Sequence, residues 1–283
     1  MSLSSLQLDA FIAVAHEKSF SGAALKMAIT QSALSQRVLN LEHELGTSLF
    51  IRESSGLRLT ESGEKLLRYC QTKEMLETEA IAHLKETSHS LAGIIRIGVF
   101  SSLAKPVIAR ISEFIKHHPD VQVEMVNSEL RHLPDLLSTG QVDFIFLNAP
   151  LERQQVECHH VGFEDYVFVR STKRHSRSDV YLDHDKEDMT TFDFFKQQGQ
   201  KKILKKRSYF NNIDLVIEAT RQGIGMALVP AHLIHEQKGL EIVSDYKSYK
   251  SPVYFCYYIQ SFYAPLQKVV IDLFRQKNFF EAN

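Results

Sequence analysis

Five polar residues at helical spacing near the start of the chain are suited to reading DNA; they are Gln31, Ser32, Ser35, Gln36 and Arg37. Short hydroxyl and amide side chains near a helix N-terminus can approach phosphates and base edges, and an arginine can grip a phosphate or a guanine. The face carries almost no carboxylate, as contact with DNA requires. A three-helix bundle whose polar face is merely solvated is the alternative interpretation.

The elements around this face have the pattern of a helix-turn-helix. Residues 6–15 are apolar at helical spacing, and Ala23, Ala24 and Met27 fit the inner side of a short second helix. Residues 28–30 fit a tight turn before a third helix, whose inner side is predicted to carry Ala33, Leu34, Val38 and Leu41. The polar residues therefore lie on the outer face of this third helix.

Residues 49–60 have the form of a β-hairpin, because two short alternating runs flank a Ser-Ser-Gly turn. Arg52 and Arg58 stand on either side of that turn, where the pair could straddle a phosphate backbone or a narrow minor groove. Thr60 is placed as the N-cap of a following helix, with Glu61 and Glu64 at its positive end. The pattern predicts the winged form of the motif.

The sequence resembles the LysR-type transcriptional regulators of bacteria. The resemblance rests on Phe-Ser-Gly-Ala-Ala at residues 20–24, Gln-Ser-Ala-Leu-Ser-Gln-Arg at residues 31–37, and on residues 41–52, 58–63 and 222–230. It is strongest before residue 63 and weakest between residues 161 and 209. It implies a double-stranded DNA partner, a small-molecule effector, a homodimer that forms a dimer of dimers, and RNA polymerase as a candidate further partner.

One long helix is predicted from residue 63 to about residue 91, a stretch without Pro or Gly after its first residue and rich in Glu, Lys, Leu and Ala. Apolar residues recur along it at intervals of three, four or seven: Leu66, Tyr69, Leu76, Ala80, Leu84 and Leu91. The small winged domain cannot bury such a seam alone, so the helix is expected to pair with the same helix of a second copy. Packing onto the C-terminal domain of the same chain is the alternative.

After residue 93 strands and helices alternate, as in a doubly wound parallel sheet. Strands are predicted at 94–100, 121–126 and 142–147 and helices at 103–116 and 130–138; short strands at 166–169, 227–229 and 253–258 supply a second lobe, and a helix at 263–280 returns to the first. The fold class is α/β, with an N-terminal winged helix-turn-helix, a long linker helix and, as the resemblance implies, a two-lobed periplasmic-binding-protein-like effector domain.

The expected domain boundaries follow from these elements. Residues 1–60 form the DNA-binding domain, 61–91 the linker and dimerisation helix, and 92–283 the effector domain. Its first lobe comprises about residues 92–160 and 261–283, and its second about residues 161–260.

Polar residues at the ends of the predicted strands are the candidates for effector binding. In open α/β sheets, ligands bind beyond the carboxyl ends of strands, where helix N-termini and free backbone donors meet. The candidates are Ser101, Ser102, Asn127, Ser128, Asn148, Tyr209, Phe210 and Gly225. A hydroxyl beside exposed helix N–H groups suits a carboxylate, so an anionic effector is expected, although capping, turn formation and core packing explain the same residue types.

Composition excludes several other classes. The 283 residues are enough for about two domains, and the net charge of −1 gives no overall nucleic-acid signature. No stretch predicts a membrane span or secretion signal, and Cys70, Cys158 and Cys256 are expected to be unpaired, so a cytoplasmic protein is expected. No phosphate loop, nucleophile elbow, metal pair or matched carboxylates occur, so no enzyme, metal or cofactor is predicted.

Two weaker patterns leave alternatives open. A redox-responsive regulator of the same fold could use Cys158 and Cys256, and a small-molecule-binding protein without DNA function could share the two lobes. The basic run formed by Lys201, Lys202, Lys205, Lys206 and Arg207 is expected to face solvent, or to favour an anion if it lies near the cleft.

Overall fold

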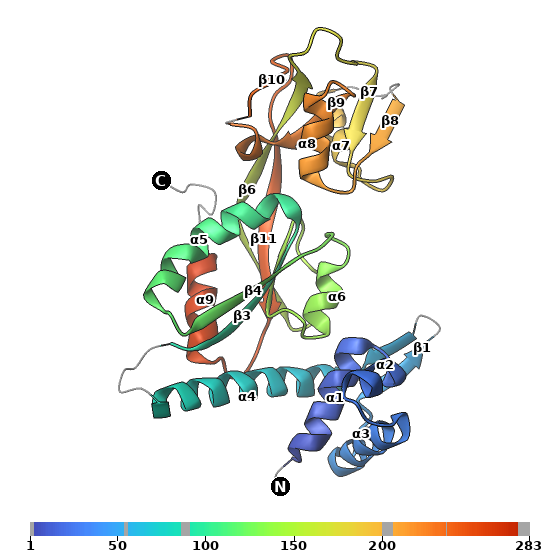
Figure 1. Cartoon of the computed structure of the whole chain (residues 1–283), viewed down its shortest axis with the longest axis vertical. Coiled ribbons are helices and arrows are strands. Elements are labelled where there is room, and N and C mark those ends of the chain that lie inside the picture. Colours follow the sequence, from blue (N-terminus) through green and yellow to red (C-terminus); the bar gives the residue numbers. More distant parts are fainter. Residues whose placement is uncertain (1–2, 54–55, 86–90, 200–205, 236, 277–283) are drawn as a thin grey trace.

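The chain forms a small helical domain, one long helix and a two-lobed α/β body, stacked along the long axis of the molecule (Figure 1). The structure is a computed structural model that describes residues 3–53, 56–85, 91–199, 206–235 and 237–276. No helix in these ranges is long and apolar enough to cross a membrane.

The N-terminal domain has the predicted winged helix-turn-helix elements: α1 (Ser5–Glu17), α2 (Phe20–Lys26), α3 (Gln31–Leu45), β1 (Phe50–Glu53) and β2 (Gly56–Leu59). Its core joins Val14 of α1 to Leu34 and Val38 of α3. Ala28 supplies the tight turn with a left-handed φ of 53°. The predicted inner position of Ala33 was wrong: its side chain is exposed, because the first turn of α3 projects beyond the core.

The long helix α4 (Glu61–Lys85) begins directly after Thr60, the predicted N-cap, whose Oγ1 accepts from the main-chain nitrogen of Gly63 at 3.0 Å; Leu91 lies beyond the end of the helix. Gly63 allows its first turn to touch the hairpin, since a Cβ there would collide with the main-chain oxygen of Leu49. Leu67 and Cys70 join the core of the N-terminal domain. The side chain of Leu84 lies outside the described residues.

Opposite faces of α4 have different surroundings. One face docks on the first lobe: Arg68 Nη2 donates to Gln155 Oε1 at 2.6 Å, and Gln71 Nε2 donates to the main-chain oxygen of Gly140 at 3.0 Å. The other face exposes Tyr69 and Leu76, which are 50% and 38% accessible. Packing within the chain is thus confirmed for one face, and much of the predicted apolar seam stays exposed on the other.

The first lobe has the predicted parallel strands β3 (Gly93–Val99), β4 (Val121–Asn127) and β5 (Phe144–Leu147), in the order β4-β3-β5. It also contains η1 (Ser101–Leu103), α5 (Ala104–His117), α6 (Leu133–Ser138) and α9 (Pro265–Arg275). Phe146, Phe255 and Phe274 are fully buried between the sheet and α9. The carboxyl ends of the three strands meet on the side that faces the second lobe (Figure 1).

Two long antiparallel strands, β6 (Val156–Ser171) and β11 (Tyr249–Tyr258), run through both lobes. The strand predicted at residues 166–169 is only the last part of β6. Charged and histidine residues interrupt the apolar–polar alternation of residues 156–165, so the sequence pattern did not reveal the first part of the strand. The second lobe adds β7 (Val180–Asp183), β8 (Lys206–Tyr209), β9 (Met226–Pro230), β10 (Leu240–Ile242), α7 (Thr190–Gln197), α8 (Ile213–Arg221) and η2 (Ala231–Leu233).

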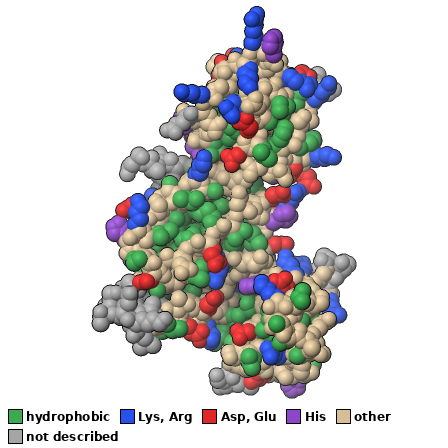
Figure 2. Space-filling view, viewed as in Figure 1, with side chains coloured by type: hydrophobic (Ala, Val, Ile, Leu, Met, Phe, Trp, Pro, Cys, Tyr) green, Lys and Arg blue, Asp and Glu red, His purple; other side chains and the backbone are tan. Residues whose placement is uncertain are grey.

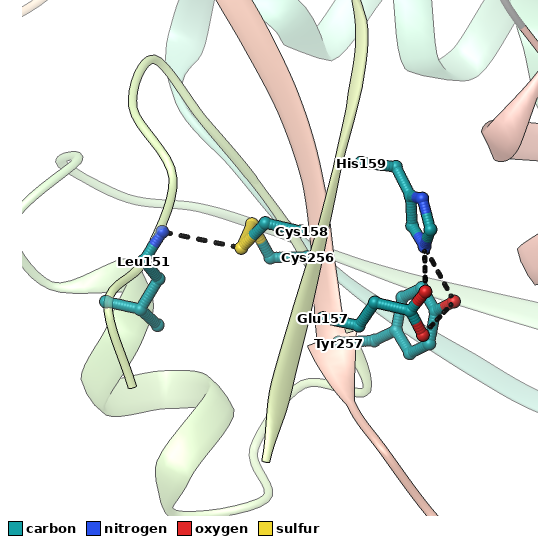
Figure 3. Close-up of a disulfide and its surroundings, with 6 residues drawn as sticks. All are labelled: Leu151, Glu157, Cys158, His159, Cys256 and Tyr257. Atoms are coloured by element: carbon teal, nitrogen blue, oxygen red, sulfur yellow. Dashed lines mark hydrogen bonds and ion pairs between the residues drawn. A yellow bond between two sulfur atoms is a disulfide. The ribbon is translucent and has the colours of Figure 1, made fainter. Parts of the chain in front are cut away.

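The expectation of three unpaired cysteines was wrong. Cys158 of β6 and Cys256 of β11 are direct partners in the antiparallel register and form a disulfide (Figure 3). Cys158 Sγ also accepts a hydrogen bond from the main-chain nitrogen of Leu151. Cys70 is free and buried, and burial raises the pKa of its thiol to about 12.

Candidate functional site

The polar face of α3 lies at the surface of the N-terminal domain. Gln31, Ser32 and Gln36 are exposed, and Ser35 and Arg37 are half-exposed. Thr30 caps the helix by accepting from the main-chain nitrogen of Ala33 at 3.2 Å, which fixes the helix start beside these side chains. Leu34, Val38 and Leu41 on the opposite side are buried, so packing holds the polar face outward.

The two hairpin arginines point to opposite faces of the β-ribbon. Arg52 pairs with Leu57 and Arg58 pairs with Ile51, and directly paired residues of an antiparallel ladder share a face. Arg58 lines a crevice between the N-terminal domain and the first lobe, together with Glu64, Asp135 and Arg153. Both arginines are exposed, Arg52 on the face of the ribbon that carries Leu57 and Arg58 on the face that carries Ile51.

A cavity of about 570 Å³ lies between the two lobes. Its first-lobe wall is formed by the segments that follow β3, β4 and β5, where the sequence analysis placed effector contacts. Five of the predicted residues line it: Ser101, Ser102, Asn127, Ser128 and Asn148. The opposite wall comes from the β7–α7 connection, the start of α8 and the crossing strands. The volume lies within the range usual for small-molecule sites.

The other three predicted effector residues do not line this cavity. Tyr209 is 41% exposed at the end of β8, and its ring lies 5.2 Å from the guanidinium of Arg207. Phe210 packs against the core of the second lobe. Gly225 allows a close approach of chains, because a Cβ there would lie 2.8 Å from the main-chain oxygen of Val180.

An acidic segment that runs from the last residue of β7 to the first turn of α7, residues 183–193, supplies much of the second-lobe wall and was missed in the sequence analysis; we call it the acidic connection. Five carboxylates occur within residues 183–193, and all line the cavity: Asp183, Asp185, Glu187, Asp188 and Asp193. The clustering of these carboxylates in the sequence was the signal that could have identified this wall. Residues 201, 202 and 205 of the basic run lie outside the described residues, and Arg207 forms an ion pair with buried Asp183.

Arg131 of the first lobe bridges the cavity to this acidic connection. Its Nη1 lies 2.6 Å from Glu187 Oε2 and its Nη2 lies 3.7 Å from Asp185 Oδ2, while Glu129 of its own lobe also pairs with it. Figure 2 shows charged side chains of both signs gathered at the right-hand junction of the two lobes. Ion pairs of this kind join the lobes across the cavity.

The buried part of the wall centres on Ser102, whose side chain is 4% exposed. Among the described residues its Oγ has no hydrogen-bond partner, and the same is true of Oε1 of Glu164. Tyr166, another lining residue, donates its hydroxyl to Glu164 Oε2 at 2.8 Å. Burial raises the pKa of Glu164 to about 7, against the lowering effect of the Tyr166 hydroxyl.

Comparison with known proteins gives two family matches that together span most of the chain. Residues 6–64 match the bacterial regulatory helix-turn-helix protein model of the lysR family, and residues 88–278 match the LysR substrate binding domain. The second match covers more than half of the chain.

Curated relatives are regulators. The chain is 32% identical over 166 residues to the HTH-type transcriptional regulator ShiR of Corynebacterium glutamicum (strain R), a match that covers 57% of this chain and 56% of ShiR. It is 27% identical over 239 residues to the HTH-type transcriptional regulator CzcR of Bacillus subtilis (strain 168), covering 81% of this chain and 80% of CzcR.

Solved structures share the whole architecture. ArgP from Mycobacterium tuberculosis superposes with a TM-score of 0.73 at 23% identity, covering 97% of both chains. The full-length LTTR LysG from Corynebacterium glutamicum with bound effector Arg superposes with a TM-score of 0.68 at 19% identity, covering 96% of this chain and 97% of LysG. At these identities the likeness establishes the fold.

Proposed function

The chain belongs to the LysR family of bacterial transcriptional regulators, and from that premise we propose how its DNA-binding and effector domains act. The outer face of α3 reads base edges with Ser32, Ser35 and Gln36. Gln31 and Arg37 support this contact, and Arg52 binds the phosphate backbone or a groove beside it. The observation that carries this proposal is the outward polar face of α3, held in place by buried Leu34, Val38 and Leu41.

Arg58 has a different position in this proposal. Its side chain is exposed on the face of the hairpin that carries Ile51 and borders the crevice beside Glu64 and Asp135, so its contact with DNA would come from that face. Both arginines are exposed, but only Arg58 borders the carboxylates of the crevice, so we assign the larger share of backbone binding to Arg52.

The inter-lobe cavity is the proposed effector site, with Ser101, Ser102, Asn127, Ser128 and Asn148 on its first-lobe wall. Since Arg131 and the acidic connection join the lobes across it, a small molecule bound there changes how the lobes are held together. Tyr209, Phe210 and Gly225 would act on the site through the packing of the second lobe. An anionic effector is not part of this proposal, because carboxylates dominate the lining.

The exposed face of α4 is the proposed dimer contact, through Tyr69 and Leu76. A dimer places two winged domains on half-sites of one operator, and a dimer of dimers follows from the same family pattern. RNA polymerase remains a candidate further partner, and we assign no catalytic step to the chain.

The test is binding of the full chain to labelled duplex DNA from its own genomic neighbourhood, measured by fluorescence anisotropy with and without unlabelled competitor of unrelated sequence. Specific binding by an oligomer is the expected result. Binding that unrelated DNA competes away equally well would contradict sequence-specific regulation.

A second candidate function, redox-responsive regulation, is favoured by the disulfide between Cys158 and Cys256. Cys256 lies two residues before Tyr258, whose hydroxyl donates to Glu64 of α4 at 3.3 Å. The disulfide is therefore close to the contact between the first lobe and the linker helix. A difference in DNA affinity between the oxidised and reduced chain, absent in Cys158→Ser, would establish this role.

A further inference from the structure

Carboxylates outnumber cationic side chains around the inter-lobe cavity. Arg131 is the only lysine or arginine among the described lining residues. The lining carboxylates are Glu129, Asp183, Asp185, Glu187, Asp188 and Asp193.

The ion pairs of the described residues do not neutralise this set. Arg207, which lies behind the wall, pairs with Asp183. Arg131 is shared between Glu129, Asp185 and Glu187. Asp188 accepts only main-chain N–H groups, from His184 and Thr190, and Asp193 has no ion pair within the described part of the chain. The cavity therefore keeps an excess of negative charge.

An unpartnered buried hydroxyl adds an independent sign of a ligand. Ser102 lines the cavity at 4% exposure, and its Oγ has no hydrogen-bond partner among the described residues. Buried polar atoms almost always have a partner, so an unpartnered one in a cavity wall marks a place where a ligand atom or water completes the bonding. A hydroxyl oxygen can accept a bond from a ligand N–H group.

One of the helix ends at the cavity, the start of α8, is poorly suited to an anion. The first turn of α8 borders the cavity, but Asn212 already caps it by accepting from the main-chain nitrogen of Asp214 at 2.7 Å. The Asp214 carboxylate also lies in that first turn, where it offsets the positive end of the helix dipole.

We propose that the inter-lobe cavity binds a small organic cation, a molecule with an amine, amidine or guanidine group, whose N–H donors bond to Ser102 Oγ and to the carboxylates of the acidic connection, residues 183–193. The proposal rests on the proposed function in taking this cavity as the effector site. Asp188 and Asp193 are available without breaking an ion pair among the described residues, and Asp193 also accepts no hydrogen bond among them. The apolar lining residues Leu130, Met189 and Ile213 suit the hydrocarbon part of such a molecule.

The experiment compares ligands that differ in charge but share a chain length. Isothermal titration calorimetry of the full chain uses 1,5-diaminopentane as the cation, 1,5-pentanediol as the neutral form and glutarate as the anion. A second pair, L-arginine and L-citrulline, exchanges a guanidinium for a neutral group of the same shape. We expect a cationic member to bind roughly tenfold or more tightly than its neutral counterpart, and raised salt to weaken it.

Two single-residue variants test where the cation binds. Ser102→Ala and Asp193→Asn should each weaken the cation by roughly tenfold, the usual effect of losing one hydrogen bond to a charged group. Asp272→Asn, the same change on an exposed residue of α9 outside the cavity lining, is the control and should bind as the wild type does. Circular dichroism melting of each variant checks that it is folded.

Two outcomes overturn the proposal: no difference between charged and neutral members in either series, or glutarate as the tightest ligand. A different outcome contradicts only the proposed effector role of the cavity. A cation that binds through Ser102 and Asp193 but changes neither DNA affinity nor oligomeric state supports the charge preference and contradicts the cavity as a regulatory site.

Discussion

His232 of the second lobe donates from Nε2 to the main-chain oxygen of Ser102 in the first lobe at 3.0 Å. The lobes are thus joined directly at the buried wall of the cavity, on the residue whose hydroxyl has no partner among the described residues. Glu164 lies beside this contact, with its Oε1 3.9 Å from His232 Nε2. Burial lowers the pKa of His232, which favours the neutral ring in this place.

The first prediction concerns the pH dependence of stability at Glu164. Its pKa is raised from 4.5 to about 7 by burial, so the folded chain holds this proton between these values while the unfolded chain has lost it. The contribution of Glu164 to stability therefore falls as pH rises from about 5 to 7, by up to about 3 kcal/mol at roughly 1.4 kcal/mol per unit.

Chemical denaturation of Glu164→Gln at several pH values tests this. The variant should gain stability relative to wild type as pH rises from about 5 to about 8. Glu241→Gln, on an exposed carboxylate of β10, serves as the matched control and should show a flat difference. A flat difference for Glu164→Gln as well would mean that the carboxyl is solvated in solution.

Local sequence patterns predicted the helices and the hairpin of the N-terminal domain. Features that depend on contacts between distant residues were not predicted from the sequence. The turn at Ala28 and the cap at Thr30 depend on neighbouring residues, so periodicity located α2 and α3 well. The opposite orientation of Arg52 and Arg58 follows from hairpin register, which spacing alone does not give. The pairing of Cys158 with Cys256 joins residues 98 positions apart.

In the effector site, too, the sequence predicted one part, and long-range contacts determine the other. Strand ends placed Ser101, Asn127 and Asn148 on one wall, because the carboxyl ends of parallel strands meet at one edge. The acidic connection faces them only because β6 and β11 fold the second lobe over the first. Contacts such as Arg131 to Glu187, 56 residues apart, arise from that arrangement.

The second prediction separates the two hairpin arginines. Arg52→Ala should weaken DNA binding for all sequences and reduce the salt dependence by roughly one phosphate contact, whereas Arg58→Ala should have a smaller effect, since Arg58 faces the crevice. Gln36→Ala should instead change sequence preference. Lys116→Ala, which changes an exposed lysine of α5 outside the N-terminal domain, is the control and should leave DNA binding unchanged. Anisotropy titrations at several salt concentrations measure these effects; equal losses for Arg52→Ala and Arg58→Ala would place both on the DNA.

The third prediction concerns the oligomer. Leu76→Glu puts a charge on the exposed apolar face of α4, and we expect it to shift the chain toward monomers in analytical ultracentrifugation. Thr78→Glu, two residues away and turned from that face, should leave the oligomer intact. An unchanged oligomer for Leu76→Glu would show that α4 does not form the contact between copies.

The last prediction concerns the disulfide. Cys158 and Cys256 are paired and Cys70 is free, so thiol titration of the unfolded, unreduced chain should find one thiol, against three after reduction by dithiothreitol. A bond that closes a loop of 98 residues stabilises the folded state by about 4.7 kcal/mol in the chain-entropy model, so reduction should lower the melting temperature. Cys158→Ser should melt at one temperature with and without reductant, while Cys70→Ser, which keeps the disulfide, should respond as wild type does. Three thiols in the unreduced chain, prepared and handled in air, would show that the two strands pair without the covalent bond and would remove the basis for redox control.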